Sequence, residues 1–139
     1  MDQKDASNGA KRSRPKVLLV DDSVTVVEML KHQLEKQGYD VVTHTKSLGT
    51  MVTILREMPD VIMLDITMPG LEGPQLCKLI KKDPSMSGAG KTPVLLYSSV
   101  SEEELKQTVA SCGADGYLHK SWSISDIVSK ISETLERKG

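Results

Sequence analysis

The residues VLLVDD, 17–22, run four apolar side chains directly into two adjacent carboxylates. An apolar run without alternation is typical of a strand that is covered on both faces of its sheet. Similar runs recur as VIMLD (61–65) and VLLYS (94–98), and a shorter one, GYLHK (116–120), ends in lysine. We therefore expect a buried parallel sheet whose strands end in polar residues.

Segments with helical spacing separate these strands, and the β-rich run VVTHT (41–45) supplies one more strand. Ser101 followed by Glu104 is a capping-box pattern, and Gly38 suits a helix end. The predicted inner faces of the helices are Val27, Leu30 and Leu34; Leu48, Met51, Val52 and Leu55; Leu76, Leu79 and Ile80; Leu105 and Val109; and Ile124, Ile127, Val128, Ile131 and Leu135. The alternation predicts an α/β domain, a doubly wound five-stranded parallel sheet with five helices on its two faces.

Composition limits the classes of protein that fit. The 139 residues suit one domain, and 38% hydrophobic with 27% charged residues is ordinary for a globular chain. Residues 1–15 lack apolar periodicity and are predicted to be a flexible tail, which leaves 16–139 as the domain. The tail is basic, but a net charge of −1 and only four aromatic residues argue against a nucleic-acid surface.

Two further features indicate the environment of the chain. Neither a signal-peptide pattern nor an apolar run long enough to span a membrane occurs, so we expect a cytoplasmic protein without membrane contacts. Cys77 and Cys112 lack ligand-spaced companions and are expected to be buried, reduced thiols. The segment Gly88–Thr92 contains GKT, but the earlier glycine and the strand-to-helix context of a phosphate loop are missing.

Polar residues follow the predicted strands where parallel strands end together. Asp21 and Asp22 follow the first strand, and Asp65, Ser98 and Lys120 follow later ones. Ligands bind at this edge of doubly wound sheets, so we expect the five side chains to converge. Oxygen ligands without His or Cys favour Mg²⁺, and a lysine beside a hydroxyl suits a phosphoryl group. That group is carried either by a ligand or by one of the acids, because a carboxylate can be a phosphoryl acceptor.

At this point the chain resembles the response-regulator receiver domains of two-component signalling, over about residues 16 to 138. The resemblance rests on VLLVDDS, VIMLDITMPGLEG, VLLYSS and GYLHK in that order. It implies the flavodoxin-like receiver fold with strand order 2-1-3-4-5. Because the last predicted helix runs to the C-terminus, we expect a stand-alone receiver similar to the chemotaxis regulators, and not an enzyme.

The same resemblance implies a phosphorylation site with a metal. Asp65 would be the phospho-acceptor and would take the group from a histidine kinase or a histidine phosphotransfer protein. Asp22, Asp65 and the backbone carbonyl of Thr67 would ligate Mg²⁺, and Asp21 would act mainly through a bound water.

The resemblance also implies a switch. Ser98 and Lys120 would contact the phosphoryl oxygens, and Tyr117 would rotate inward after phosphorylation. The surface of the fourth helix, fifth strand and fifth helix would then meet a downstream protein. One residue departs from the family pattern, because Ser121 stands where receivers usually have proline after the lysine.

Two alternative functions are weighed. An Asp-nucleophile phosphatase of the haloacid dehalogenase kind needs a DxD motif, whereas the residue two beyond Asp21 is Ser23, and the chain has no room for a second, enclosing domain. A phosphorylation-independent interaction module on the same fold is the other. The five polar residues at the strand ends are all present, which favours the phospho-accepting function.

Overall fold

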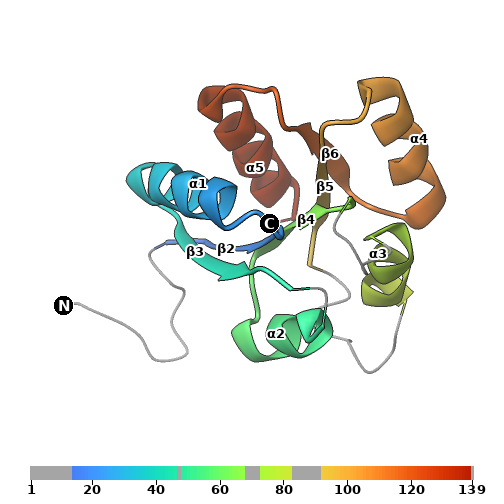
Figure 1. The fold of residues 1–139 in the computed structure, drawn as a ribbon, viewed down its shortest axis with the longest axis horizontal. Helices are drawn as coiled ribbons and strands as arrows, with labels where there is room; N and C mark the ends of the chain where they lie inside the picture. Colours follow the sequence, from blue (N-terminus) through green and yellow to red (C-terminus); the bar gives the residue numbers. More distant parts are fainter. Residues whose placement is uncertain (1–13, 47, 68–72, 83–91, 139) are drawn as a thin grey trace.

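The computed structural model describes residues 14–46, 48–67, 73–82 and 92–138 (Figure 1). Its strands are β2 (Lys16–Val20), β3 (Asp40–His44), β4 (Val61–Asp65), β5 (Val94–Ser98) and β6 (Gly116–His119). Its helices are α1 (Val24–Lys36), α2 (Thr50–Glu57), α3 (Gly73–Lys82), α4 (Glu102–Cys112) and α5 (Ile124–Lys138).

The strands form one parallel sheet in the order β3-β2-β4-β5-β6. Counted along the chain this is the order 2-1-3-4-5, so the predicted fold class is confirmed. The first strand lies in the middle and pairs with both β3 and β4, which places the end of β2 beside the end of β4. The strand order reverses at this point, where ligands bind in sheets of this kind.

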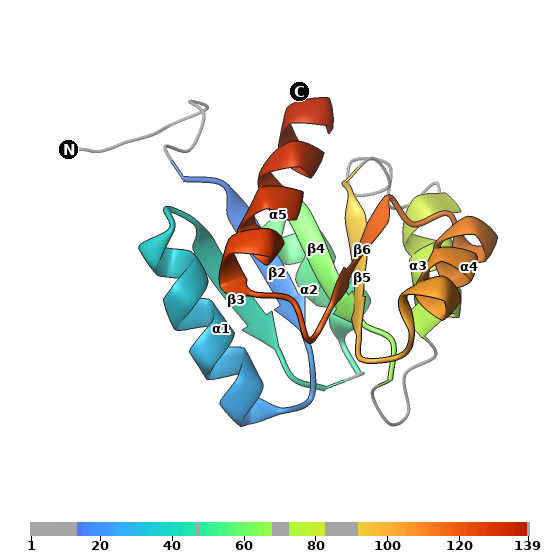
Figure 2. The ribbon, with the colours of Figure 1, turned by 90° about the horizontal axis from the view of Figure 1, so that it is seen from above.

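Helices cover both faces of the sheet, as Figures 1 and 2 show. Leu18 and Val20 face a core that includes residues of α2, α3 and α4. Val17 and Leu19 face a second core that includes residues of α1 and α5. Successive side chains of a strand point to opposite faces, so a strand between two cores must be apolar at every position. This explains the unbroken apolar run that ends at Asp21.

Local signals define the helix ends. The Ser23 hydroxyl accepts a long hydrogen bond of 3.5 Å from the backbone N–H of Val26 at the start of α1. At the start of α4 the Ser101 hydroxyl accepts from the N–H of Glu104 at 3.1 Å, so the predicted cap is confirmed. Gly113, with φ of 82°, ends α4 in a conformation that glycine adopts without strain.

Of the four residues predicted for the inner face of α2, Met51 packs against the core, and the other three are exposed, against the prediction. Leu48 precedes the helix and is 87% exposed, and Val52 and Leu55 also lie on its exposed side. The buried side consists of Ile54 with two threonines. Burial of those threonines is compatible with their polarity because the Thr50 hydroxyl donates to a backbone carbonyl and the Thr53 hydroxyl lies 3.3 Å from the His44 ring. In α3, Leu79 is likewise exposed, against the prediction.

The N-terminal end of the described chain is held to the domain. Arg14 donates hydrogen bonds to the carbonyls of Glu35 and Tyr39 and forms an ion pair with Asp40. Pro15 accepts a hydrogen bond from the N–H of Asp40. The tail assigned to residues 1–15 is therefore in contact with the fold at its last two residues, while its remainder lies outside the described residues.

Three other predictions concern the rest of the chain. Of the segment Gly88–Thr92, only Thr92 lies within the described residues. Cys77 and Cys112 are buried and free, as predicted. Within the ranges that the structure covers, no helix is both long and apolar enough to cross a membrane.

Candidate acidic site at the carboxyl edge of the sheet

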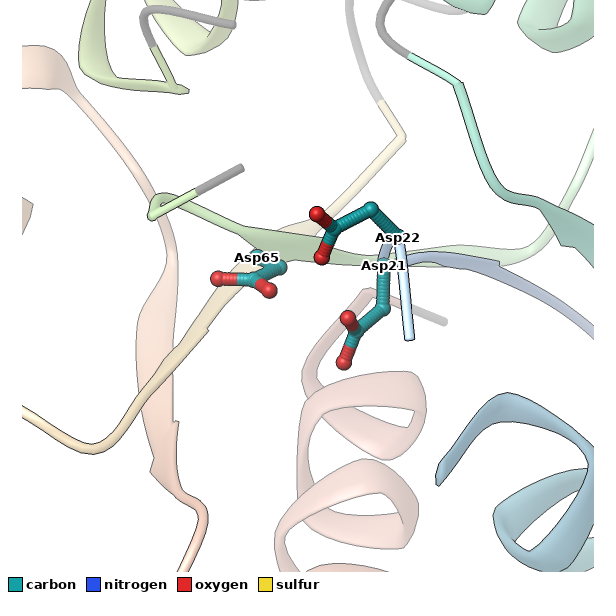
Figure 3. A group of neighbouring side chains, drawn as sticks. All are labelled: Asp21, Asp22 and Asp65. Carbon is teal, nitrogen blue, oxygen red and sulfur yellow. The ribbon is translucent and has the colours of Figure 1, made fainter. Parts of the chain in front are cut away.

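Three carboxylates lie together at the ends of β2 and β4 (Figure 3). Asp21 and Asp22 follow β2, and Asp65 is the last residue of β4. One oxygen from each lies within 4.8 Å of the others. Asp21 and Asp65 are buried, whereas Asp22 is exposed. The parallel pairing of β2 with β4 brings them together, as expected for neighbouring strands that end at the same edge.

Lys120 supplies the positive charge of the site. Its ammonium nitrogen lies 3.1 Å from Oδ2 of Asp65 and 3.3 Å from Oδ2 of Asp21. It also lies 5.2 Å from the centre of the Tyr97 ring, within the range of a cation–π contact. Burial disfavours the charged ammonium, but the two carboxylates outweigh it and raise the pKa of Lys120. The lysine therefore stays charged and partly balances the acidic cluster.

Asp21 is the carboxylate whose charge is least well accommodated. Burial raises its pKa, and the neighbouring charge of Asp65 raises it further, against the lowering effect of the Ser23 N–H and of Lys120. The Ser23 N–H donates to Oδ1 at 3.0 Å, but the buried Oδ2 accepts no hydrogen bond. The Lys120 ammonium, 3.3 Å from Oδ2, offsets part of the cost of burying this oxygen, and a divalent cation beside it would offset more.

Both oxygens of Asp65 are in contact with donors. Thr67 donates twice to Oδ1, from its backbone N–H at 2.9 Å and from its hydroxyl at 2.7 Å. Lys120 donates to Oδ2. A metal ion or a phosphoryl group on Asp65 would share these oxygens with the Thr67 and Lys120 donors.

Ser98 is the last residue of β5, and Tyr117 lies on β6, where it pairs with Leu96. The buried Ser98 hydroxyl accepts from the N–H of Val100 at 3.2 Å, and the Ser98 carbonyl accepts from the N–H of Lys120 at 2.9 Å. Tyr117 is half-buried, and its hydroxyl donates to Oε1 of Glu102 at 2.8 Å. Its phenol is therefore attached to the first residue of α4.

Three residues of the site region were not predicted from the sequence. Tyr97 contacts Lys120, and Glu102 and Trp122 contact the Tyr117 side chain, with 5.7 Å between the two ring centres. Tyr97 was identifiable, since it directly precedes Ser98 at the end of the buried strand β5. The contact of Glu102 depends on how α4 sits against β6, which no local pattern encodes.

The donor set fits a divalent cation. All the side-chain ligands of the cluster are carboxylate oxygens. Mg²⁺ and Ca²⁺ prefer oxygen ligands, whereas transition metals favour the nitrogen of histidine and the sulfur of cysteine. The buried Asp21 oxygen without a hydrogen bond fits the same conclusion. Mg²⁺ typically takes one or two carboxylates and completes its shell with water and phosphate oxygens, which suits a cluster with one exposed member.

Comparisons with known proteins agree with this geometry. A family model described as the response regulator receiver domain matches residues 17–132. The Bacillus subtilis alkaline phosphatase synthesis transcriptional regulatory protein PhoP is 32% identical over 122 residues, which is 88% of this chain and 49% of PhoP. The chain thus spans about half the length of this curated relative.

Solved structures show the same fold. The chemotaxis response regulator CheY4 of Vibrio cholerae is 28% identical, with a TM-score of 0.77 over 87% of this chain and 98% of CheY4. The receiver domain of the Francisella response regulator 1452 is 28% identical, with a TM-score of 0.79 over 91% of this chain and all of that domain.

Proposed function

Because the chain belongs to the response regulator receiver domains, we propose that Asp65 accepts a phosphoryl group from a phosphohistidine. The donor would be a histidine kinase or a histidine phosphotransfer protein, and the phosphorylated chain would signal through protein contacts in the cytoplasm. One observation carries the proposal. Asp65 is buried at the end of β4, with a second carboxylate and the Lys120 ammonium both close to it.

The reaction follows from the chemistry of these groups. An oxygen of Asp65 attacks phosphorus in line, and the new P–O bond forms as the P–N bond to the donor histidine breaks. The electron pair of the P–N bond stays on the ring nitrogen, so a donor ring that carries a proton on its other nitrogen leaves as neutral imidazole. Lys120, already 3.1 Å from Oδ2, stays beside the phosphoryl oxygens and balances their charge. Asp22, Asp65 and the carbonyl of Thr67 would hold Mg²⁺, with Asp21 acting mainly through a bound water, and the ion would supply further positive charge near the same oxygens.

The response begins at Ser98 and Tyr117. Phosphorylation adds charge and acceptor oxygens beside a buried hydroxyl. We infer that Ser98 moves toward the phosphoryl group and that Tyr117 then leaves Glu102 and rotates inward. The surface formed by α4, β6 and α5 changes with it, and a downstream protein recognises the new surface. Moving such a switch from 1:99 to 99:1 requires about 5.5 kcal/mol of differential stabilisation.

The test is phosphorylation by a small donor. Acetyl phosphate with Mg²⁺ should add the mass of one phosphoryl group to the protein, and Asp65→Asn should abolish the addition. Asp126→Asn, which removes an exposed acid from α5, is the matched control and should be modified normally. Lys120→Ala should permit some modification but uncouple it from the Tyr117 response, because the phosphoryl group loses its charged neighbour.

The outcomes separate the two remaining functions. Modification of a serine or histidine in place of Asp65 would overturn the proposal. A protein that takes up no phosphoryl group, yet binds the same partner with and without the donor, would be a phosphorylation-independent interaction module.

A further inference from the structure

The turn after β6 carries Lys120 into the site. The N–H of Trp122 donates to the carbonyl of His119 at 3.0 Å, which places Lys120 and Ser121 at the two central positions of a turn. The N–H of Lys120 donates to the carbonyl of Ser98 at 2.9 Å. The backbone of the lysine is thus fixed to the end of β5 on one side and to this turn on the other.

The side chain of His119 closes the same turn. Its Nδ1 lies 3.0 Å from the backbone nitrogen of Ser121 and 2.7 Å from the Ser121 hydroxyl. A backbone N–H can only donate, so Nδ1 is the acceptor and carries no proton in this arrangement. The neutral ring therefore has its proton on Nε2.

We propose that His119 is a positioning residue of the phospho-accepting site, which fixes the turn that aims Lys120 by accepting both hydrogen bonds of Ser121. The inference rests on the proposed role of Lys120. The contact exists because residue 121 is not proline, since a proline has no N–H to donate. In this chain the hydrogen bonds between Ser121 and the His119 ring restrict the backbone of the turn, as a proline ring at position 121 would do.

The position of the lysine backbone determines what its ammonium can reach. In the present structure Nζ, at the end of the lysine side chain, forms ion pairs with Asp65 and Asp21. A phosphoryl group on Asp65 changes the contacts at that tip, but it leaves the backbone anchors in place. The turn is then what keeps the ammonium within reach of the new oxygens, and misplacement of a reacting group by about 1 Å can slow a reaction by roughly 100-fold.

A merely structural role would predict a different result in a double-variant experiment. The variants are His119→Leu, which removes the acceptor, and His119→Asn, whose Oδ1 stands in for Nδ1. Each is made in the natural chain and in Ser121→Pro, which has no N–H or hydroxyl to donate. The measured quantities are the rate of modification of Asp65 by acetyl phosphate at saturating Mg²⁺ and the melting temperature.

In the natural chain we expect His119→Leu to slow modification by about tenfold and His119→Asn to retain a rate within about twofold of the original. In the Ser121→Pro chain we expect His119→Leu to change the rate by less than about twofold, because the partner of the ring is already gone. An equal effect of His119→Leu in both chains would overturn the proposal. Equal rates for the Asn and Leu variants would do the same.

Two NMR measurements on the unmodified protein keep the proposal separate from the proposed function. Long-range ¹H–¹⁵N spectra should show His119 with its proton on Nε2, and a proton on Nδ1 would contradict the inferred contact. The NMR signals of the Lys120 side chain should show that this side chain becomes more mobile in His119→Leu and not in His119→Asn. If the natural chain takes no phosphoryl group on Asp65, the proposed function fails, while these two measurements still decide whether His119 positions Lys120.

Discussion

Tyr117 is held at the surface by Glu102, because its hydroxyl donates to Oε1 of that residue at 2.8 Å. The indole N–H of Trp122 makes a longer contact of 3.5 Å with the other oxygen. These two donors lower the pKa of Glu102, and the same hydrogen bond raises the pKa of Tyr117. The aromatic that is proposed to rotate inward is therefore tied to the first turn of α4 beforehand.

The first prediction is that Glu102→Gln favours the inward position of Tyr117. A neutral amide is a weaker acceptor than a carboxylate, so the outward state loses part of its advantage. Trp122 is the only tryptophan of the chain, and its ring packs beside Tyr117, so its fluorescence reports the change. The spectrum of unmodified Glu102→Gln should move toward that of the phosphorylated natural protein.

Glu103→Gln is the control, since it removes the same charge from the same helical turn. A shift of equal size in this variant would mean that the effect is one of net charge and not of the Tyr117 contact. The pH dependence has a defined sign, because the pKa of Glu102 is lowered from 4.5 in the folded protein. The contact is present above that value and is lost as the pH falls through the lowered pKa.

The second prediction is that Asp21→Asn stabilises the metal-free protein and weakens Mg²⁺ binding. The pKa of Asp21 is raised above 3.8, so its contribution to the free energy of unfolding is present below 3.8 and is lost as the pH rises through the raised pKa. At neutral pH the buried charge is destabilising. Removing the cost of burying this charge, together with its repulsion from Asp65, outweighs the lost attraction to Lys120 by an amount of about 1 kcal/mol, or a few degrees in melting temperature.

Asp22→Asn separates the two effects, because Asp22 is exposed while Asp21 is buried. Both variants should bind Mg²⁺ more weakly than the natural protein in titrations followed by amide shifts. Only Asp21→Asn should raise the melting temperature clearly in the presence of a chelator. Equal melting temperatures for Asp21→Asn and the natural chain would show that the Asp21 charge is already compensated without metal.

The sheet was predictable because its strands lie between two cores. Unbroken apolar runs such as 17–20 and 61–64 are required by burial on both faces, and the residue after each run lies at the ligand-binding edge. The positions of Asp21, Asp65 and Lys120 in the sequence follow from this requirement.

The faces of short helices were less predictable. In α2 the helix begins only after Gly49, which has φ of 87°. Leu48 therefore falls outside the helix although its spacing to Val52 and Leu55 is helical. Hydroxyl groups that find hydrogen-bond partners, as those of Thr50 and Thr53 do, can occupy the buried side in place of leucine. Hydropathy alone does not record such partners.

Individual side-chain contacts away from the ends of the strands, or set by a local turn, were not predictable. Glu102 meets Tyr117 across 15 positions, and the Thr67 hydroxyl meets Asp65 only because the chain turns directly after β4. Both contacts depend on side-chain rotamers and on the packing of helices, which residue patterns do not specify.

The third prediction concerns the close approach of α3 to the chain after β4. A Cβ atom on Gly73 would lie 2.7 Å from the Cα of Ile66, which is too close for any side chain. Gly73→Ala must displace the backbone beside Asp65, and overpacking of this kind costs roughly 1 to 3 kcal/mol. Urea unfolding should show the loss, together with slower modification of Asp65. The control is Gln75→Ala at an exposed position of the same helix, which should change neither the stability in urea nor the rate of modification of Asp65. An unchanged stability of Gly73→Ala would show that the backbone adjusts freely.

The fourth prediction is that phosphorylated Asp65 is long-lived. The resemblance to receiver domains implies that the side chains two positions beyond the phospho-acceptor and two beyond the hydroxyl residue, here Thr67 and Val100, would orient the water that hydrolyses the acyl phosphate. The Thr67 hydroxyl donates to Asp65 itself, and the half-buried Val100 packs against the core and has no polar group. Neither residue offers a carboxylate or an amide that could orient a water, and lost orientation slows a reaction strongly.

The measurement is the decay of the phosphorylated protein after removal of the donor. The double variant Thr67→Asn with Val100→Glu should decay about tenfold faster than the natural chain, because both new side chains can hold a water by hydrogen bonds. Thr67→Val is the matched control, since it keeps the shape of residue 67 and adds no such group. If the double variant decays no faster than the natural chain, orientation of water does not limit the lifetime, and the turn at Ser121 that positions Lys120 becomes the part of the site to vary next.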